Sequence, residues 1–160
     1  MKRGYCGIGI ERAKREVNLG TLFRSAHALG ADFVFTIGAR YQAQASDTSK
    51  AWRHLPYFSF HDFSDFNEHR PYDCPLVGVE LLPGAQALES FVHPERALYL
   101  LGPEDGDLSA EAIAHCQAIV RFSSDFCLNV AAAGTVILYD RQLKRAHASR
   151  AERGLELVHA

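Results

Sequence analysis

Short apolar runs alternate with segments of helical spacing along the whole chain, and this alternation constrains the fold more than any other feature. Runs rich in valine, isoleucine, leucine and phenylalanine are typical of strands that are buried on both faces. When helices separate such strands, the strands are expected to lie parallel in one α/β sheet. Six strands are predicted on this pattern, at residues 5–10, 33–37, 57–60, 75–81, 96–101 and 118–122. Helices are predicted at residues 19–29, 63–68, 86–91 and 109–116, and from Leu128 onward.

The length of 160 residues suits one domain that buries its own core without metal or disulfide support. An apolar content of 48% and a charged content of 22% are typical of globular proteins. The net charge of -2 gives no overall positive field. Non-specific binding to polyanions is therefore not indicated.

The four cysteines are Cys6, Cys74, Cys116 and Cys127, and none shows the spacing of a zinc site. They are predicted to be reduced thiols, as in a cytoplasmic protein, and no metal site is expected. No run approaches 18 apolar residues, and the apolar stretch 4–10 is too short for a signal peptide. We therefore expect a cytoplasmic protein without a membrane anchor.

The segment 122–141 combines a loop with a helix. From Leu128 the apolar residues cover most of the helix circumference. The first half of this helix is therefore predicted to be buried, and its basic end with Arg141, Lys144 and Arg145 to be solvated. Asn129 is a polar residue at the start of the apolar helix, and burying an unpaired amide costs about 1–3 kcal/mol. Asn129 therefore either caps the helix and braces the loop or faces a ligand.

The segment 38–54 is long for a connection and carries Arg40, Lys50 and Arg53 around Trp52. One interpretation is a mobile loop that contacts the substrate. The alternative is a surface loop with Trp52 as its anchor. The sequence leaves both open.

Three motifs occur in order along the chain. They run from Asn18 to Arg24 (NLGTLFR), from Leu101 to Leu108 (LGPEDGDL) and from Cys127 to Val130 (CLNV). Together they resemble the motifs of the SpoU/TrmH RNA 2′-O-ribose methyltransferases, a branch of the SPOUT superfamily. The resemblance implies a parallel six-stranded α/β sheet with a C-terminal deep trefoil knot, which periodicity alone would not suggest because knots are rare.

The same resemblance implies a single SPOUT methyltransferase domain over residues 1–160, without a separate RNA-binding domain. S-adenosyl-L-methionine is the implied cofactor, and the implied assembly is a homodimer. The expected substrate is RNA, tRNA more than rRNA. Neither DNA nor a membrane is an expected partner.

The resemblance places the cofactor at three loops that follow strands. Ligands gather at the carboxyl ends of the strands in open α/β sheets, which is where these loops lie. Gly102 permits a close approach of the backbone to a ligand, and Glu104 is expected to stabilise the cofactor loop or the knot rather than to act as a base. The residues carried over as cofactor contacts are Leu81, Gly102, Glu104, Phe122, Cys127 and Leu128.

The residues carried over to catalysis are Arg24, Asn18 and Asn129. Arg24 matches the catalytic arginine of the family. Because an arginine has a pKa above about 12, we expect Arg24 to position a phosphate or ribose oxygen. Removal of the hydroxyl proton by Arg24 would need a strongly altered environment. Asn18 lies at the start of a predicted helix, so it either caps that helix or contributes to the substrate site.

Two positions depart from the family pattern. Cys127 replaces the usual serine, and a thiol is a weaker hydrogen-bond donor than a hydroxyl. Phe122 and Ser123 replace the usual Ile-Pro. Cys127 leaves open a catalytically silent homologue that binds RNA or cofactor, and also a cysteine nucleophile. An unrelated nucleotide-binding protein is less favoured, since the chain lacks Gly-x-Gly-x-x-Gly and a P-loop.

Overall fold

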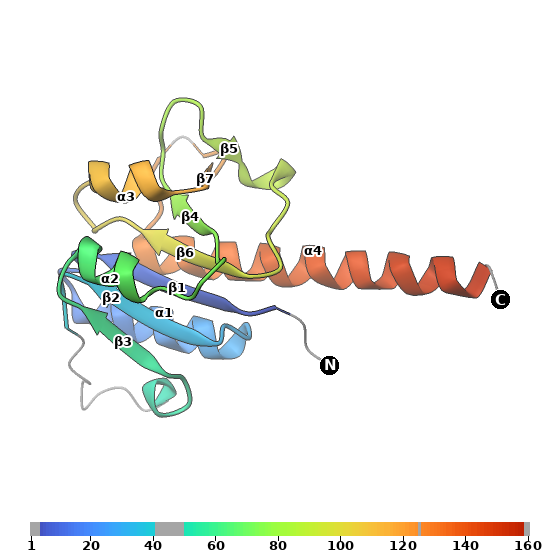
Figure 1. Ribbon diagram of the computed structural model, residues 1–160, viewed down its shortest axis with the longest axis horizontal. Coiled ribbons are helices and arrows are strands. Elements are labelled where there is room, and N and C mark those ends of the chain that lie inside the picture. The colour runs from blue at the N-terminus through green and yellow to red at the C-terminus, as the bar shows by residue number, and fades with distance from the viewer. Residues whose placement is uncertain (1–3, 41–49, 125, 159–160) are drawn as a thin grey trace.

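An all-parallel sheet of seven strands forms the centre of the computed structural model (Figure 1), which describes residues 4–40, 50–124 and 126–158. The strand order is β3-β2-β1-β6-β4-β7-β5. The strands are β1 (Cys6–Glu11), β2 (Phe33–Ile37), β3 (Tyr57–Phe60), β4 (Leu76–Val79), β5 (Gln86–Ala87), β6 (Ala97–Leu101) and β7 (Ala118–Arg121). The strands β1, β4 and β6 are buried along their whole length, which explains their continuous apolar sequences.

Helices cover both faces of the sheet. The helices α1 (Glu16–Ala28) and α4 (Val130–Val158) share one core layer, and α2 (Phe63–His69) and α3 (Ala110–His115) share the other. Two 3-10 turns, η1 (Ala51–Arg53) and η2 (Leu88–Ser90), lie in the connections. Figure 1 shows the last turns of α4 extending beyond the sheet. Within the described residues, no helix combines the length and apolarity that crossing a membrane requires.

Each predicted strand is present, with bounds that differ by at most two residues. The predicted count of six is wrong, because β5 lies inside the segment 86–91 that was expected to be helical. Only η2 in this segment is helical, and β5 pairs with β7. A strand of two residues shows no alternation for a sequence pattern to detect. Gly30 follows the end of α1 as predicted, with a φ of 74° that favours glycine.

The connection after β2 is only partly described, since residues 41–49 lie outside the described ranges. A mobile substrate loop over 38–54 therefore stays a prediction. The turn η1 packs against α1, and the half-buried Trp52 packs against the core. This placement agrees with Trp52 as an anchor.

Gly134 lets α4 lie close to α1 and β1. A Cβ atom on Gly134 would lie 2.5 Å from Leu22 Cδ1 and 3.3 Å from Ile8 Cδ1. The next residue, Thr135, donates a hydrogen bond to Ser25 Oγ at 2.7 Å. The first turns of α4 are thus held on α1 by close packing and by a polar contact.

One side of α4 is apolar and yet exposed. Ile137 and Leu138 are buried, as predicted for the first half of the helix. Val136, Tyr139 and Leu143 are 39%, 56% and 43% exposed. Their spacing of three and four residues places them on one stripe of the helix. The predicted burial is therefore confirmed for one side of α4 only.

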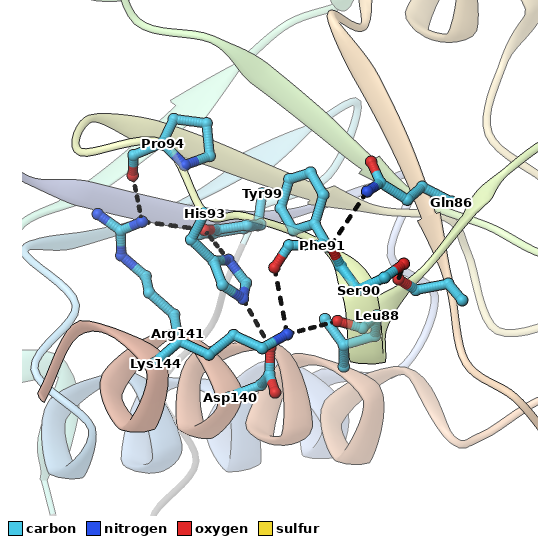
Figure 2. A network of polar contacts seen from close by, with 11 residues as sticks. Gln86, Leu88, Ser90, Phe91, His93, Pro94, Tyr99, Asp140, Arg141 and Lys144 are labelled. Carbon is cyan, nitrogen blue, oxygen red and sulfur yellow. Dashed lines mark hydrogen bonds and ion pairs between the residues drawn. The ribbon is translucent and has the colours of Figure 1, made fainter. Parts of the chain in front are cut away.

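The prediction of a solvated basic segment in α4 is wrong for Arg141. This residue is 5% exposed. Its guanidinium donates to the carbonyl oxygen of Pro94 and to Tyr99 Oη (Figure 2), and it also donates to the carbonyl oxygen of Glu95. Because α4 continues to Val158, Arg141 lies in the middle of the helix rather than at its end. The oxygen acceptors stabilise a charge that would otherwise be costly to bury.

His93 links the segment before β6 to α4 (Figure 2). Its Nδ1 lies 2.6 Å from Tyr99 Oη, and its Nε2 lies 2.8 Å from Asp140 Oδ2. Lys144 Nζ donates to the carbonyl oxygen of Leu88 and lies 2.7 Å from Asp140 Oδ2. Burial lowers the pKa of His93, Asp140 raises it, and the positive charges of Arg141 and Lys144 lower it again; the net shift is downward, so the ring is neutral near pH 7. A neutral ring accepts the Tyr99 proton at Nδ1 and donates from Nε2 to Asp140.

Candidate functional site

A cavity of about 350 Å³ lies at the carboxyl ends of β4, β6 and β7. Its lining residues come from the segments 79–81, 101–107 and 121–133. These are the ends of the three strands and the connections that leave them, together with the first turn of α4. The position is the one at which open parallel sheets bind ligands.

The residues predicted to contact a cofactor all line this cavity, and so does Asn129. They are Leu81, Gly102, Glu104, Phe122, Cys127 and Leu128. Among the described residues, no group of three or more histidine, cysteine, aspartate or glutamate side chains could hold a metal ion.

Gly102 brings the backbone after β6 against the end of β4. A Cβ atom on Gly102 would lie 3.2 Å from Glu80 Oε2 and 3.2 Å from the amide nitrogen of Leu108. The Glu80 carboxylate holds the same turn, because it accepts hydrogen bonds from the N–H groups of Leu81 and Leu108, both at 3.0 Å. A larger side chain at Gly102 would therefore disturb the wall of the cavity.

Glu104 joins the cavity to the start of α1. Its carboxylate accepts the N–H groups of Lys14 at 3.0 Å and Arg15 at 3.1 Å, and the side-chain amide of Asn18 at 2.8 Å. Partial burial raises the pKa of Glu104, but these hydrogen bonds lower it by more than burial raises it, so the net shift is downward. An ionised carboxylate with three donors is a structural brace and a poor general base.

Asn18 and Asn129 extend this brace to α4. Asn129 Nδ2 donates to Asn18 Oδ1 at 3.1 Å, and Asn129 Oδ1 accepts the N–H of Ala131 at 3.0 Å. Asn129 thus caps α4 and contacts a neighbouring motif while it lines the cavity. Asn18 does not cap α1, because that helix begins at Glu16 with Arg15 at the cap position. The chain of contacts from Glu104 through Asn18 to Asn129 brings the three sequence motifs together.

Arg24 lies apart from this group. Its side chain is exposed on α1 and is not among the described residues that line the cavity. It shares a face of the helix with Val17, which is 60% exposed. The structure therefore does not bring Arg24 to the cavity of its own chain.

Cys127 is exposed at the cavity. No histidine or lysine occurs among the described residues that line the cavity. A catalytic cysteine is usually paired with a general base such as histidine; the described lining supplies Arg121 as its one cation and no such base, so it does not favour that chemistry.

Sequence reasoning did not single out five charged or aromatic residues of the cavity, namely Glu80, Asp105, Asp107, Arg121 and Phe126. Glu80 directly follows the apolar run of β4, and a charged residue at the end of a buried strand is the signal that could have identified it. Phe126 is 83% exposed, which is unusual for a large aromatic side chain.

The SpoU rRNA Methylase family matches residues 7–139 of the sequence, which include all the motifs described above. The chain belongs to this family. No curated protein matches the chain.

Solved structures of SpoU proteins share the fold. AviRb, a SpoU methyltransferase from Streptomyces viridochromogenes, is 24% identical with a TM-score of 0.80, and the match covers 91% of this chain and 62% of AviRb. AviRb is also known in complex with the cofactor AdoMet. The TrmH/SpoU tRNA modifying enzyme of A. aeolicus is 17% identical with a TM-score of 0.81, covering 92% of this chain and 79% of that one. The chain therefore spans less than two thirds of the length of AviRb.

A third solved structure with the same fold was determined in a study of the 2-OH methylation of C/U34 on tRNA. It is 22% identical with a TM-score of 0.73, and the match covers 88% of this chain and 97% of that one. Its length is therefore close to that of the present chain.

Proposed function

We propose that the chain transfers a methyl group from S-adenosyl-L-methionine to a ribose 2′-hydroxyl of RNA. The observation that carries the proposal is the cavity at the strand ends, whose walls are joined by the contacts of Glu104, Asn18 and Asn129. Family membership and the AdoMet complex of AviRb support the choice of cofactor. The cofactor supplies an activated methyl group on a sulfonium ion.

The residues at the cavity fit such a cofactor. Gly102 leaves space where a side chain would press on the neighbouring turn, so backbone groups can approach a ligand closely. Leu81, Phe122 and Leu128 offer apolar surface, and the backbone around Cys127 offers polar groups. Glu104 holds the loop after β6 in place and takes no part in proton transfer.

A homodimer would bring Arg24 to a cavity. Arg24 and Val17 lie on one exposed face of α1, and the exposed apolar stripe of Val136, Tyr139 and Leu143 lies on α4, which packs against α1. A second copy that covers this stripe would place Arg24 of one chain near the cavity of its partner. There Arg24 would hold a phosphate or ribose oxygen with its planar fork of donors.

The proposed substrate is tRNA rather than rRNA. The structure from work on tRNA C/U34 methylation supports this choice because the present chain covers almost its whole length. The exposed ring of Phe126 at the cavity offers a surface on which a base can stack. A cytoplasmic location and the absence of DNA from its partners belong to the same proposal.

We also propose the knotted path that the family resemblance implies. The strand β7 lies between β4 and β5, which are joined to each other by residues 80–85. The strand β7, which comes later in the sequence, thus lies in the sheet between two strands that an earlier connection joins. This arrangement supports the knot, and a tracing of the backbone in a crystal structure would test it.

The decisive experiment is incubation of the protein with labelled S-adenosylmethionine and tRNA or rRNA from cells that lack the activity, followed by mapping of the modified nucleotide. Gly102→Val should abolish donor binding and transfer. Gly106→Ala is the control in the same loop, since its Cβ would meet only Pro103 at 3.5 Å. Donor binding without transfer to either RNA would instead favour the silent homologue, and unchanged binding in Gly102→Val would remove Gly102 from the site.

A further inference from the structure

The cavity carries more negative than positive charge. The described residues that line it include the acidic residues Glu80, Glu104, Asp105 and Asp107, against a single cation, Arg121. Glu104 is surrounded by three donors, and Asp105 lies 2.7 Å from Lys14 Nζ. Those two charges are therefore partly compensated by groups outside the cavity.

Glu80 differs from these two carboxylates. It is half-buried, and the peptide N–H groups of Leu81 and Leu108 fix both of its oxygens. Within the described part of the chain, no cation forms an ion pair with Glu80. Two peptide hydrogen bonds orient a carboxylate but leave its charge in place. Glu80 Oε2 also lies 3.2 Å from the point where Gly102 would carry a side chain, so the charge borders the space open to a ligand.

We propose that Glu80 makes the cavity select the positively charged methyl donor over its uncharged demethylated product. The inference rests on the proposed function. S-adenosylmethionine carries a sulfonium charge in addition to an ammonium and a carboxylate, so its net charge is +1, whereas the demethylated thioether has a net charge of zero. An uncompensated carboxylate at the edge of the cavity stabilises the donor and not the product.

The methyl transfer removes the charge that Glu80 recognises. A lone pair of the ribose oxygen forms the new C–O bond, the C–S bond breaks, and its electron pair stays on sulfur. The hydroxyl proton passes to solvent. The positive charge thus leaves the cofactor as the proton is released, and the product loses its attraction to Glu80. Release of product and entry of a new donor are both favoured.

Calorimetric titration with S-adenosylmethionine and with its demethylated product tests this selection. A single half-buried charge should change the ratio of the two Kd values by about threefold to tenfold. Glu80→Gln removes the charge, so the preference for the donor should fall by that factor, although loss of one hydrogen bond will weaken both ligands. The matched control is Glu111→Gln on α3, which removes an exposed charge away from the cavity and should leave the ratio unchanged.

Two further measurements separate charge from structure. Glu80→Asp keeps the charge, so it should keep most of the preference even where both affinities fall. Raising the salt from about 50 mM to about 500 mM should reduce the preference of the native protein more than that of Glu80→Gln. An unchanged ratio in Glu80→Gln, or a lost preference in Glu80→Asp, would overturn the inference. Failure of the native protein to bind either ligand would overturn the proposed function itself.

Discussion

Replacement of Asn18 by alanine should loosen the cavity and destabilise the fold together. The variant loses the 2.8 Å hydrogen bond to the Glu104 carboxylate and the 3.1 Å hydrogen bond from Asn129. Hydrogen bonds to charged groups contribute about 1.5–3 kcal/mol and neutral ones about 0.5–1.5 kcal/mol. In the variant, Glu104 still accepts the N–H groups of Lys14 and Arg15, so its carboxylate is not left unpaired. The cost should therefore lie in the lower half of the summed range of the two hydrogen bonds. We expect a loss of about 2–3 kcal/mol in the free energy of unfolding.

Urea denaturation of Asn18→Ala measures this loss, and thermal melting should show a decrease of roughly 5–10 °C for a chain of this size. The matched control is Thr21→Ala on the same helix, since Thr21 is exposed and its hydroxyl donates to the carbonyl oxygen of Val17, a contact within one turn of α1. The control should change stability by less than about 0.5 kcal/mol. If Asn18→Ala were as stable as the control, the contacts between the three motifs would contribute nothing and the reasoning would be refuted.

Three other predictions concern catalysis, assembly and pH. Arg24→Ala or Arg24→Lys should reduce single-turnover methylation by about 100-fold or more, while donor affinity and melting temperature barely change; near-native methylation would show that Arg24 has no catalytic role. Tyr139→Glu should convert the proposed dimer to a monomer in analytical ultracentrifugation, and a native protein that is monomeric at micromolar concentration would exclude that dimer. The pKa of His93 is lowered from its ordinary value of 6.5, so below about pH 6.5 the unfolded chain takes up a proton before the folded one. The free energy of unfolding should therefore decrease as the pH is lowered below about 6.5, by up to about 1.4 kcal/mol per pH unit, and His93→Gln should lose this part of the dependence. Identical pH profiles for the two proteins would contradict the neutral buried ring.

The sheet was predictable because its signal is local. Short runs rich in aliphatic and aromatic side chains marked the strands, and Gly30 marked the end of α1. The missing strand, β5, has two residues and is defined only by its pairing with β7. Arg141 was misplaced for a similar reason. Its acceptors at Pro94 and Glu95 lie more than 40 residues away, and a basic residue on a helix shows no sequence sign of such partners.

The candidate site depended on the family resemblance rather than on the pattern. The contacts of Asn18 reach across 86 residues to Glu104 and 111 residues to Asn129. No periodicity connects positions at these distances, whereas motif order suggested that they belong together. Glu80 fell outside the motifs and was missed, since the N–H group of Leu108 that holds its carboxylate lies 28 residues away in the sequence.

The described cavity constrains how the hydroxyl proton can leave during the proposed reaction. It contains no histidine or lysine, and the hydrogen bonds on Glu104 lower the pKa of that carboxylate and weaken it as a base. Arg24 is exposed, and an arginine side chain is a poor general base. We infer that orientation of the ribose and the charge already present on the methyl donor supply most of the rate, with the proton released to solvent. Positioning by a planar guanidinium explains why Arg24→Lys, which keeps the charge and loses the fork of donors, should be almost as impaired as Arg24→Ala.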